Sequence, residues 1–542
     1  MKKNRRQQIL SIIMPLSLLW ISSSFTQISE KLLNSITTPD EVETRLGALQ
    51  FKDGYPTRQT AAKIRDELDY INGVNTFMNS TRGVSLYAFR KGLLDIGVED
   101  NDVLLFSELM DSKGLFLTGN TDTIYYITFL DLSEGPVVFE APPEALGIID
   151  DMWFRYISDF GFGGAERGKG GKYLLVGPGY NGPLPENEFI VRKSRTLRVV
   201  ILGRQFLIKN NPKPVVAIIK ESLKIYPYRP GGLGTPISSY LSGKIKSLHI
   251  PAKPKTPRFV EGSKKVINSI YPNDYSYFEM LHKLVQMEPA EALDPEIAGQ
   301  FAAIGIVKGK AFTPDERMRK ILEKAAAFGN AASRTLGMGA LPAKQFRFYD
   351  ESSAWWNMLW EGGYNFLNPP PMITKKGAKQ FPNTGARKLY SRTAMFYSAT
   401  GITPLMCMRL TDIGSQYLLA NVDSTGKPFD GSQTYKIDLP KNIPAARFWS
   451  LTVYDNQTRS MLQTSQQYPR AGSQSYPSPS AVPNPDGSIT IYFGPDQPKN
   501  VPDGNWIQTD PAKGWFTVLR LYSPLEAFFD KSWRPSEIKL VK

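Results

Sequence analysis

The sequence predicts a mainly β protein with a helical insert near its middle. Short runs rich in β-branched and aromatic residues, separated by Gly, Pro and Asp, fill the stretch from Ile124 to Val176 and return between Tyr435 and Leu521. Between these stretches, apolar residues recur at helical spacing over residues 259–345. The 542 residues include 44 Gly and 41 Pro, which suits many turns and short strands.

Residues 1–24 have the pattern of a signal peptide. A cationic start (MKKNRRQQ) precedes an apolar run (ILSIIMPLSLLWI) and small serines suited to cleavage. The run is shorter than the ~20 residues that span a bilayer and contains Pro15, so we expect no stable membrane anchor once the leader is removed. The expected location is periplasmic or secreted. Cys407 is the single cysteine, so no intrachain disulfide can form.

Composition indicates a folded globular chain, with 41% hydrophobic and 21% charged residues. The formal charge is +14, but Lys and Arg are scattered and form no long basic run interleaved with aromatic residues. We therefore expect no nucleic-acid partner. A small-molecule ligand is the expected partner, and a homo-oligomer stays open.

The N-terminal domain is predicted over residues 57–228. Its leading helix, Thr57–Ile71, has apolar residues on one face and Thr57 as cap. Short strands are expected from about Val84 to Val200, including Ile124–Leu130, Val137–Phe139 and Tyr173–Val176. Gly168–Lys172 (GKGGK) only loosely resembles a phosphate loop and is interpreted as a turn. Residues 229–258 are rich in Pro, Gly and Lys and are predicted to be a linker.

The helical segment is predicted over residues 259–345. Apolar residues recur at helical spacing from Tyr277 to Val285, and Asp294-Pro295 has the order of a helix start. A capping box at Thr313–Glu316 begins a further helix that Gly329 is expected to end. These apolar stripes are interpreted as core faces.

The C-terminal domain is predicted over residues 346–542. Its strands are expected at Tyr435–Ile437, Phe448–Tyr454, Ile489–Phe493 and Phe516–Leu521, a spacing typical of an antiparallel sandwich or jelly roll. The Ser-, Pro- and Gln-rich stretch Gln466–Pro485 is predicted to be an exposed, mobile loop.

Several kinds of chemistry lack their residues. The two histidines, His249 and His282, have no His or Cys partner at ligand spacing, which disfavours zinc sites and Ser–His–Asp or Cys–His catalysis. No catalytic residue is assigned. Oxygen ligands, aromatic rings, Arg and hydroxyl groups remain.

Two groups of side chains suggest a ligand site in the N-terminal domain. If Asp151–Asp159 is extended, Asp151, Trp153 and Arg155 share one face, as a binding site or as an internal ion pair capped by an indole. A calcium or magnesium ion is the one cofactor suggested, with turn capping as the alternative role for its candidate ligands. These carboxylates are Asp122, Asp150, Asp151, Asp159 and Glu166.

Long phrases of the chain resemble a bacterial family that consists of two domains of unknown function, numbered 1254 and 1214. The first module is matched by NTDTIYYITFLDL, DDMWFRYISDFG and GKGGKYLLVGPGYNGPLP, and the second by DSTGKPFDGSQTYKIDLP, FWSLTVYD and DGSITIYF. The resemblance implies an N-terminal immunoglobulin-like β-sandwich, a central helical segment and a C-terminal jelly-roll β-sandwich. It implies no activity. The chain lacks the family's Asn-Arg-Tyr phrase after FWSLTVYD, and TGARKLYSRTA around Arg392 matches imperfectly.

The leading hypothesis is a site for a small polar or aromatic ligand in a cleft between the two β domains. Its hydrolytic versions use a cation-polarised water, or two carboxylates that act on a glycoside. The alternative is a non-enzymatic cell-envelope or surface interaction protein. One wall would consist of Asn120, Asp122, Tyr125, Asp151, Trp153 and Arg155. The other wall would consist of Arg392, Trp449, Tyr454 and Asp455.

Overall fold

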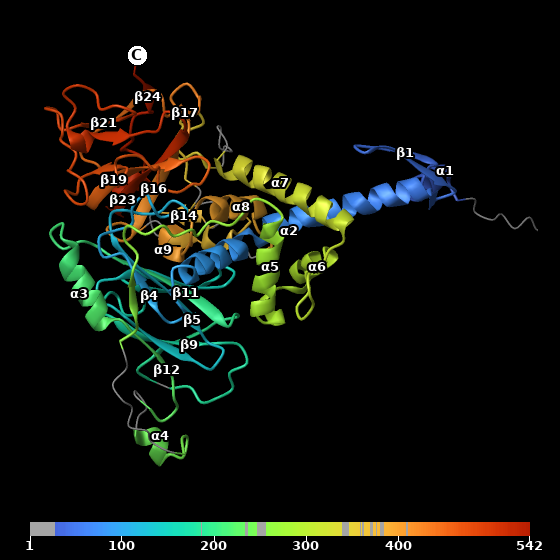
Figure 1. Cartoon of the computed structure of the whole chain (residues 1–542), viewed down its shortest axis with the longest axis horizontal. Helices are drawn as coiled ribbons and strands as arrows, with labels where there is room; N and C mark the ends of the chain where they lie inside the picture. Colours follow the sequence, from blue (N-terminus) through green and yellow to red (C-terminus); the bar gives the residue numbers. More distant parts are fainter. Residues whose placement is uncertain are drawn as a thin grey trace, which may run out of the picture. The chain divides into compact units, whose positions relative to one another are not determined.

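The computed structural model describes residues 28–185, 187–232, 237–246, 256–338, 346–357, 359, 363–368, 372–374, 377–379, 384–407 and 410–541 (Figure 1). The predicted signal peptide and His249 lie outside these residues. The chain divides into two compact units, Met1–Leu68 and Asp69–Lys542. No helix in the described ranges is long and apolar enough to cross a membrane.

The first unit holds α1 (Glu30–Ile36) and an antiparallel sheet of β1 (Glu41–Thr44), β2 (Gly47–Lys52) and β3 (Tyr55–Pro56). The long helix α2 (Arg58–Leu94) begins here and continues into the second unit. Thr57 caps it as predicted, since its Oγ1 accepts a hydrogen bond from the Thr60 amide at 3.2 Å. The strands expected from Val84 onward are wrong up to Leu94, because the last turns of α2 bury their apolar residues in the core of the second unit.

The N-terminal module of the second unit contains two sheets around a shared apolar core. The six-stranded sheet has the order β13 (Phe259–Glu261), β4 (Val103–Leu105), β5 (Ile124–Asp131), β11 (Arg198–Gln205), β7 (Leu146–Asp151) and β8 (Tyr156–Gly161). The four-stranded sheet has the order β10 (Ile190–Lys193), β9 (Gly171–Val176), β6 (Val137–Ala141) and β12 (Lys224–Pro227). The three strands predicted in this module are confirmed. Helix α3 (Pro212–Ser222) adds Val215 and Ile219 to the core, and α4 (Ile237–Leu241) follows β12.

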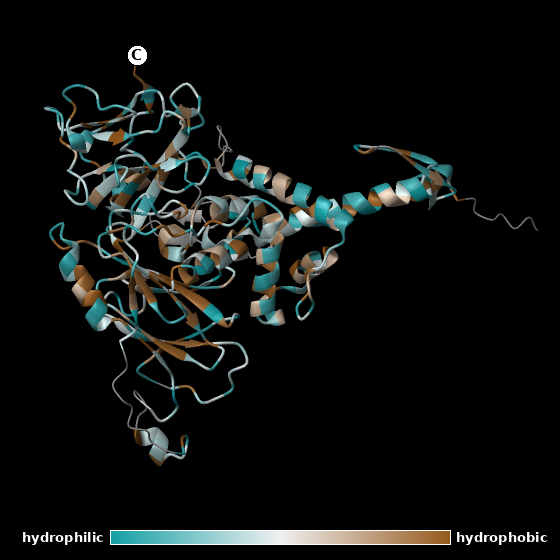
Figure 2. Ribbon diagram, viewed as in Figure 1, coloured by the Kyte–Doolittle hydropathy of each residue, from teal (hydrophilic) through white to brown (hydrophobic). Residues whose placement is uncertain are grey.

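Strand β5 is buried on both faces. Ile124, Tyr126 and Leu130 point into the core between the two sheets, whereas Tyr125 and Ile127 pack on the opposite side, with the core that contains α2. Because both faces are buried, the sequence of β5 is almost continuously apolar. Figure 2 shows the strands of this module mostly in brown, the colour of hydrophobic residues.

The helices of the central segment are α5 (Ser276–Met287), η1 (Ala290–Ala292), α6 (Pro295–Ala303) and α7 (Glu316–Met338). The predicted helices are confirmed, but Asp315 rather than Thr313 accepts the capping bond, from the Met318 amide at 2.7 Å. The expected stop at Gly329 is wrong. A Cβ at Gly329 would lie 2.6 Å from Phe77, so the glycine permits close packing on α2 inside a continuous helix. Short elements η3 (Gly363–Asn365), α8 (Leu389–Ser398) and α9 (Pro404–Cys407) lead to the last module.

The C-terminal module also contains two sheets around one core. The larger has the order β16 (Ser415–Ala420), β23 (Gly514–Pro524), β19 (Ala445–Asp455) and β20 (Arg470–Gly472), with β17 (Phe429–Asp430) also paired to β23. The smaller has the order β22 (Trp506–Gln508), β21 (Ile489–Gly494), β18 (Tyr435–Leu439) and β24 (Lys539–Leu540). The hairpin β14 (Met372–Thr374) and β15 (Gly377–Lys379), η4 (Asp503–Asn505) and α10 (Glu526–Phe529) complete the elements.

The four strands predicted in this module are confirmed. The exposed loop predicted over Gln466–Pro485 is wrong at Arg470–Gly472, which forms the buried strand β20 beside β19. The described chain is therefore a mixed structure of β sheets and several helices, less dominated by strands than predicted, because α2 and α7 are long.

Candidate ligand-binding site

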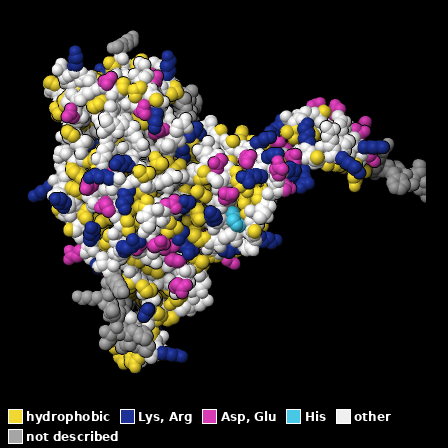
Figure 3. Space-filling view, viewed as in Figure 1, with side chains coloured by type: hydrophobic (Ala, Val, Ile, Leu, Met, Phe, Trp, Pro, Cys, Tyr) yellow, Lys and Arg dark blue, Asp and Glu magenta, His cyan; other side chains and the backbone are white. Residues whose placement is uncertain are grey.

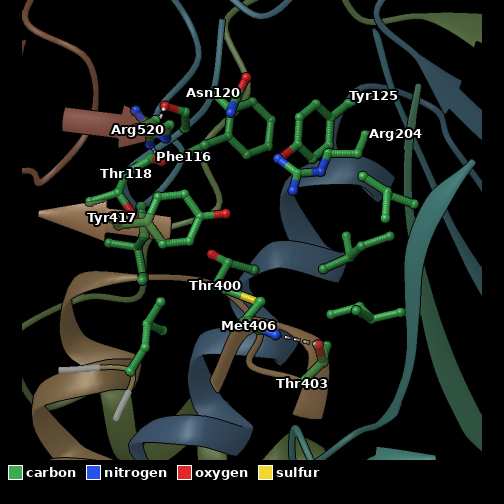
Figure 4. Close-up of a pocket in the computed structure, with 18 of the residues that line it drawn as sticks. Phe116, Thr118, Asn120, Tyr125, Arg204, Thr400, Thr403, Met406, Tyr417 and Arg520 are labelled. Atoms are coloured by element: carbon green, nitrogen blue, oxygen red, sulfur yellow. Dashed lines mark hydrogen bonds between the residues drawn. The ribbon is translucent and has the colours of Figure 1, made fainter. Parts of the chain in front are cut away.

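A cavity of about 200 Å³ lies between the six-stranded sheet of the N-terminal module and the five-stranded sheet of the C-terminal module (Figure 4). Residues of β5, β7, β8 and β11 line one side, and residues of β16 and β23 line the other. Parts of α2, of α8 and of the loop that includes Thr400 and Thr403 complete the wall. All lining residues belong to the second compact unit.

The two sheets present the same arrangement to the cavity. On antiparallel strands, side chains of directly paired residues lie on the same face. Tyr125 of β5 pairs with Arg204 of β11, and two residues further on Ile127 pairs with Leu202. In the other sheet Tyr417 pairs with Arg520, and Leu419 with Val518. Each of these two strand pairs therefore contributes one tyrosine, one arginine and two aliphatic side chains.

Hydrogen bonds hold the polar end of the cavity together across the two modules. Arg204 Nη2 donates to Ser415 Oγ at 2.8 Å, and Ser415 Oγ lies 2.7 Å from the Tyr417 hydroxyl. Arg520 Nη2 donates to the Thr118 carbonyl at 2.9 Å, and its Nη1 donates to Thr452 Oγ1 at 3.2 Å. Since a guanidinium has five N–H donors, these bonds fix each arginine and leave donors for a ligand.

The electrostatics of this end favour negative charge. Burial alone raises the pKa of Tyr417, but Arg204, the Ser415 hydrogen bond and Arg520 outweigh it, so the net pKa is lowered. Burial raises the pKa of Tyr125, and Arg204 opposes the shift. Arg520 is 4% exposed. Two cations thus face a space where an anion would lose little to solvent screening.

One carboxylate lines the cavity among the residues that the structure describes, that of Asp159. Burial raises its pKa to about 6, although hydrogen bonds from Thr403 and Tyr156 and from the Leu405 backbone oppose the shift. A carboxyl group with this pKa can exchange a proton near neutral pH.

The remainder of the wall is apolar. Figure 4 places Asn120, Tyr125, Arg204, Tyr417 and Arg520 toward one side, and Thr400, Thr403 and Met406 toward the other. Aromatic, aliphatic and methionine side chains lie around them, including Phe89, Met110, Phe116, Leu146, Leu359, Met395 and Leu405. The cavity therefore combines an apolar body with a cationic end.

Of the residues predicted from sequence, Asn120 and Tyr125 line this cavity. Asp122 does not line it; its side chain is fully buried and pairs with Arg470 Nε at 2.9 Å. Ser450 Oγ and the Tyr522 hydroxyl donate to Asp122 Oδ2 at 2.6 and 2.9 Å. Asp122 is therefore occupied by internal partners.

The predicted group Asp151, Trp153 and Arg155 lies elsewhere. The segment is not extended, because β7 ends at Asp151 and a turn precedes β8. Asp151 Oδ1 accepts from the Trp153 and Arg155 amides at 2.8 and 3.0 Å, and Arg155 Nε donates to Asp151 Oδ2 at 2.6 Å. Trp153 is buried and stacks on Phe301 with ring centroids 6.0 Å apart. The acid and guanidinium thus form an ion pair that closes the turn.

The second predicted wall also lies outside the cavity. Arg392 Nη2 donates to Asn79 Oδ1 at 2.9 Å, and Trp449 is buried in the core of the C-terminal module. Tyr454 does not line the cavity, and its hydroxyl donates a hydrogen bond to the Gly119 carbonyl at 2.6 Å. Asp455 pairs with Lys513 at 2.7 Å.

The carboxylates suggested as cation ligands do not converge. Among the described residues, no group of three or more His, Cys, Asp or Glu side chains is placed to hold a metal ion. Asp122 and Asp151 are paired with arginines, and Glu166 accepts a hydrogen bond from the Tyr173 hydroxyl. Asp150 is buried, and burial followed by the charges of Asp151 and Asp159 raises its pKa well above the usual value.

No sequence pattern indicated Arg204, Tyr417 or Arg520 as site residues. The nearest signal was an arginine inside a mainly apolar strand, as at Arg204 in RVVILGRQ and Arg520 in GWFTVLRLYSP. A charged residue in a strand that is buried on both faces needs a partner, and here the partners come from another module. Sequence alone does not show that the two sheets face one another.

The comparisons with known proteins agree with this two-module arrangement. Residues 101–227 match the family "Protein of unknown function (DUF1254)", and residues 414–526 match "Protein of unknown function (DUF1214)". The chain thus carries these two domains in the predicted order. The cavity takes Tyr125 and Arg204 from the first and Tyr417 and Arg520 from the second.

No curated protein matches the chain. Among solved structures, the VPA0106 protein from Vibrio parahaemolyticus is similar, with 17% identity, a TM-score of 0.49, and coverage of 88% of this chain and 100% of that one. A putative uncharacterized protein from Burkholderia cenocepacia has 10% identity, a TM-score of 0.35, and coverage of 88% and 95% respectively.

Proposed function

We propose that the protein binds a small amphipathic anion in the cavity between its two β modules. The ligand class is a carboxylate with a compact apolar or aromatic body. Its carboxylate would take up the free donors of Arg204 and Arg520, and its body would lie on the apolar wall that includes Phe116 and Met395.

One observation carries this proposal: two guanidinium groups, the half-buried one of Arg204 and the buried one of Arg520, come from different modules and line a cavity whose described wall has one carboxylate. Burying a cation costs free energy unless a partner of opposite charge compensates it. Tyr125, Tyr417 and Ser415 compensate only with dipoles while they are neutral. An anionic ligand would complete the balance.

The volume supports a ligand of about one ring. An apolar cavity of ~150 Å³ is large enough to take up benzene. The present cavity, at about 200 Å³, therefore suits a six-membered ring that carries one carboxylate, or an aliphatic acid of similar size.

Matched pairs of ligands test the proposal. Calorimetric titration of the purified chain with aromatic and aliphatic carboxylates, each beside its amide or alcohol of equal shape, should show binding of the acids alone. Equal binding of the uncharged partners, or none by any acid, would refute the proposed role of the arginines. Repeating the titration with a chelator present tests whether a cation contributes.

A hydrolytic role is the second candidate, and Asp159 is the observation that favours it. Its pKa of about 6 suits a general base that activates water near neutral pH. The two-carboxylate glycosidase mechanism is less well supported, because one carboxylate lines the described wall. If a carboxylate ester is hydrolysed, kcat/KM should rise through pH 6, and Asp159→Asn should abolish turnover while it preserves ligand binding.

Export and the two named folds are part of the same proposal. The pattern of residues 1–24 supports a signal peptide and a periplasmic or secreted location. The paired sheets of each module support an immunoglobulin-like sandwich followed by a jelly roll. Mass spectrometry of the mature N-terminus after cell fractionation tests export, because a retained Met1 in the cytoplasm would contradict it.

A further inference from the structure

Three separate elements meet at a second place on the molecule, outside the lining of the cavity. The turn between β7 and β8 packs on α2 so closely that a Cβ at Gly83 would lie 2.4 Å from the Trp153 ring. The same turn packs on α8, where Phe154 stacks on Phe396 with centroids 5.0 Å apart and planes at 11°. The turn is thus fixed against both helices.

Each of these elements carries an arginine close in sequence to a residue of the contact. Arg82 precedes Gly83 on α2, Arg392 lies one turn before Phe396 on α8, and Arg155 follows Phe154 in the turn. We name Arg82, Arg155 and Arg392 the arginine triad. None of the three lines the cavity described above.

The triad has few partners. Arg155 Nε is paired with Asp151, but its Nη2 is buried without a hydrogen-bond partner among the described residues. The same holds for Arg82 Nε. Arg392 donates to a neutral group, the Asn79 side-chain carbonyl. Three cations are therefore set against one bonded carboxylate.

The pKa shifts of two of these arginines agree with an excess of positive charge. Burial, then the charges of Arg392 and Arg155, lower the pKa of Arg82 to about 9, against the opposing influence of Asp151 and Asp294. The Asp294 side chain is 67% exposed and already faces Arg195 at 3.5 Å. Burial and the charge of Arg387 lower the pKa of Arg392 to about 10.

We propose that the arginine triad is a binding site for a phosphoryl dianion. Three guanidinium groups and one carboxylate leave two positive charges, which a dianion balances. Planar guanidinium forks also match phosphate oxygens in a bidentate way. The Arg155 side chain is 20% exposed, so an anion can reach the site from solvent. The phosphoryl group comes from free phosphate, a phosphorylated small molecule or a lipid headgroup.

Thermal unfolding of the full chain in inorganic phosphate tests this proposal, with sodium chloride at equal ionic strength as reference. Phosphate should raise Tm by ~2 °C or more over chloride, since a ligand that binds only the folded state stabilises it. In Arg82→Met the phosphate effect should vanish. Without phosphate, this variant should be as stable as the wild type or more so, because it loses a cation whose buried Nε has no hydrogen-bond partner among the described residues.

Arg90→Met provides the matched control on the same helix. Arg90 is bonded through two nitrogens to Asp100, at 2.8 and 2.6 Å. Its loss should lower Tm and leave the phosphate effect intact. If Arg82→Met does not fold, Arg392→Gln replaces it, with the same expected loss of the phosphate effect.

Two results would overturn the proposal. One is an equal Tm in phosphate and chloride for the wild type. The other is an Arg82→Met variant that is destabilised without phosphate yet keeps the full phosphate effect, which would make the triad structural. Glycerol phosphate and phosphatidic acid vesicles, compared with inorganic phosphate, identify the source. Loss of carboxylate binding in the cavity would leave this result unaffected, so the two proposals fail separately.

Discussion

Two sets of buried charge lie close together in this protein and differ in how they are balanced. Outside the lining of the cavity, the side chains of Asp122 and Arg470 are both 0% exposed, and their charged atoms lie 2.9 Å apart. Ser450 and Tyr522 complete the bonds to Asp122. In the cavity wall, Arg204 and Arg520 have hydroxyl and carbonyl partners but no bonded carboxylate among the described residues.

We interpret the first set as structural and the second as part of the proposed ligand site. A buried ion pair joins β20 of the C-terminal module to the segment before β5, and its two opposite charges lie 2.9 Å apart. The cavity arginines are held in place with charge left over, which is the arrangement expected when a ligand supplies the missing anion. The following predictions test this distinction.

Breaking the Asp122–Arg470 ion pair should have the largest effect on stability. Asp122→Asn leaves Arg470 buried without its counter-charge, and breaking such a pair costs about 3–5 kcal/mol. Urea unfolding should report this loss in the free energy of unfolding. The double variant Asp122→Asn with Arg470→Met should recover part of it. An unchanged midpoint in the single variant would show that the pair is not what secures the contact.

The pH dependence of stability should reveal Asp159 in the cavity wall. Its folded pKa of about 6 lies above the usual 3.8, so the native state favours the protonated form. Stability from this group is complete below pH ~4 and falls by about 3 kcal/mol as pH rises to 6. Unfolding midpoints between pH 4 and 7 should show the fall.

Asp159→Asn is the control for this profile, since it cannot ionise. The variant should lose the part of the fall that ends near pH 6. It should keep the part due to Glu288, whose pKa burial raises to about 7. A variant profile that superimposes on the wild type would show that Asp159 is not perturbed.

Substitution of the cavity arginines should have its largest effect on ligand binding. Arg204→Met and Arg520→Met each remove a charge-assisted hydrogen bond worth about 1.5–3 kcal/mol. Carboxylate affinity should therefore fall about 10- to 150-fold in each, by calorimetry. Arg319→Met, at an exposed site on α7 where the side chain is 59% accessible, should bind normally. Equal losses in all three variants would indicate a general charge effect.

Replacing one tyrosine by phenylalanine, at the buried ion pair and in the cavity wall, should give the smallest effects. Tyr522→Phe removes a donor to Asp122 and should cost about 1–3 kcal/mol of stability, because a buried oxygen loses its partner. Tyr417→Phe should leave stability nearly unchanged and weaken carboxylate binding by about 0.5–1.5 kcal/mol. Parallel urea and calorimetric measurements check both. The reverse pattern would exchange the roles assigned to the two tyrosines.

Local patterns predicted most strands correctly, because burial fixes their composition. The run from Ile124 and the four C-terminal strands are apolar wherever they enter a core. The end of α2 and the run of α7 past Gly329 were missed, since Gly and polar residues there serve close helix packing that no local pattern reveals. Strand β20 was missed because its Ser- and Pro-rich surroundings predict a loop.

The candidate site was less accessible from sequence. Asn120 and Tyr125 were selected from a polar turn and an adjoining strand, and both line the cavity. Acidic and aromatic residues such as Asp122 and Trp449 were selected by residue type. Residue type does not distinguish a side chain with an internal partner from one that contacts a ligand. The proposed roles of Arg204 and Arg520 depend on two sheets that are distant in sequence and face one another.

A crystal structure with a bound aromatic carboxylate tests the central claim most directly. The account predicts that the carboxylate oxygens lie within hydrogen-bonding distance of both Arg204 and Arg520, with the ring on the apolar wall. A carboxylate that instead points away from these two guanidinium groups, or a ligand bound outside the space between the two sheets, would contradict it.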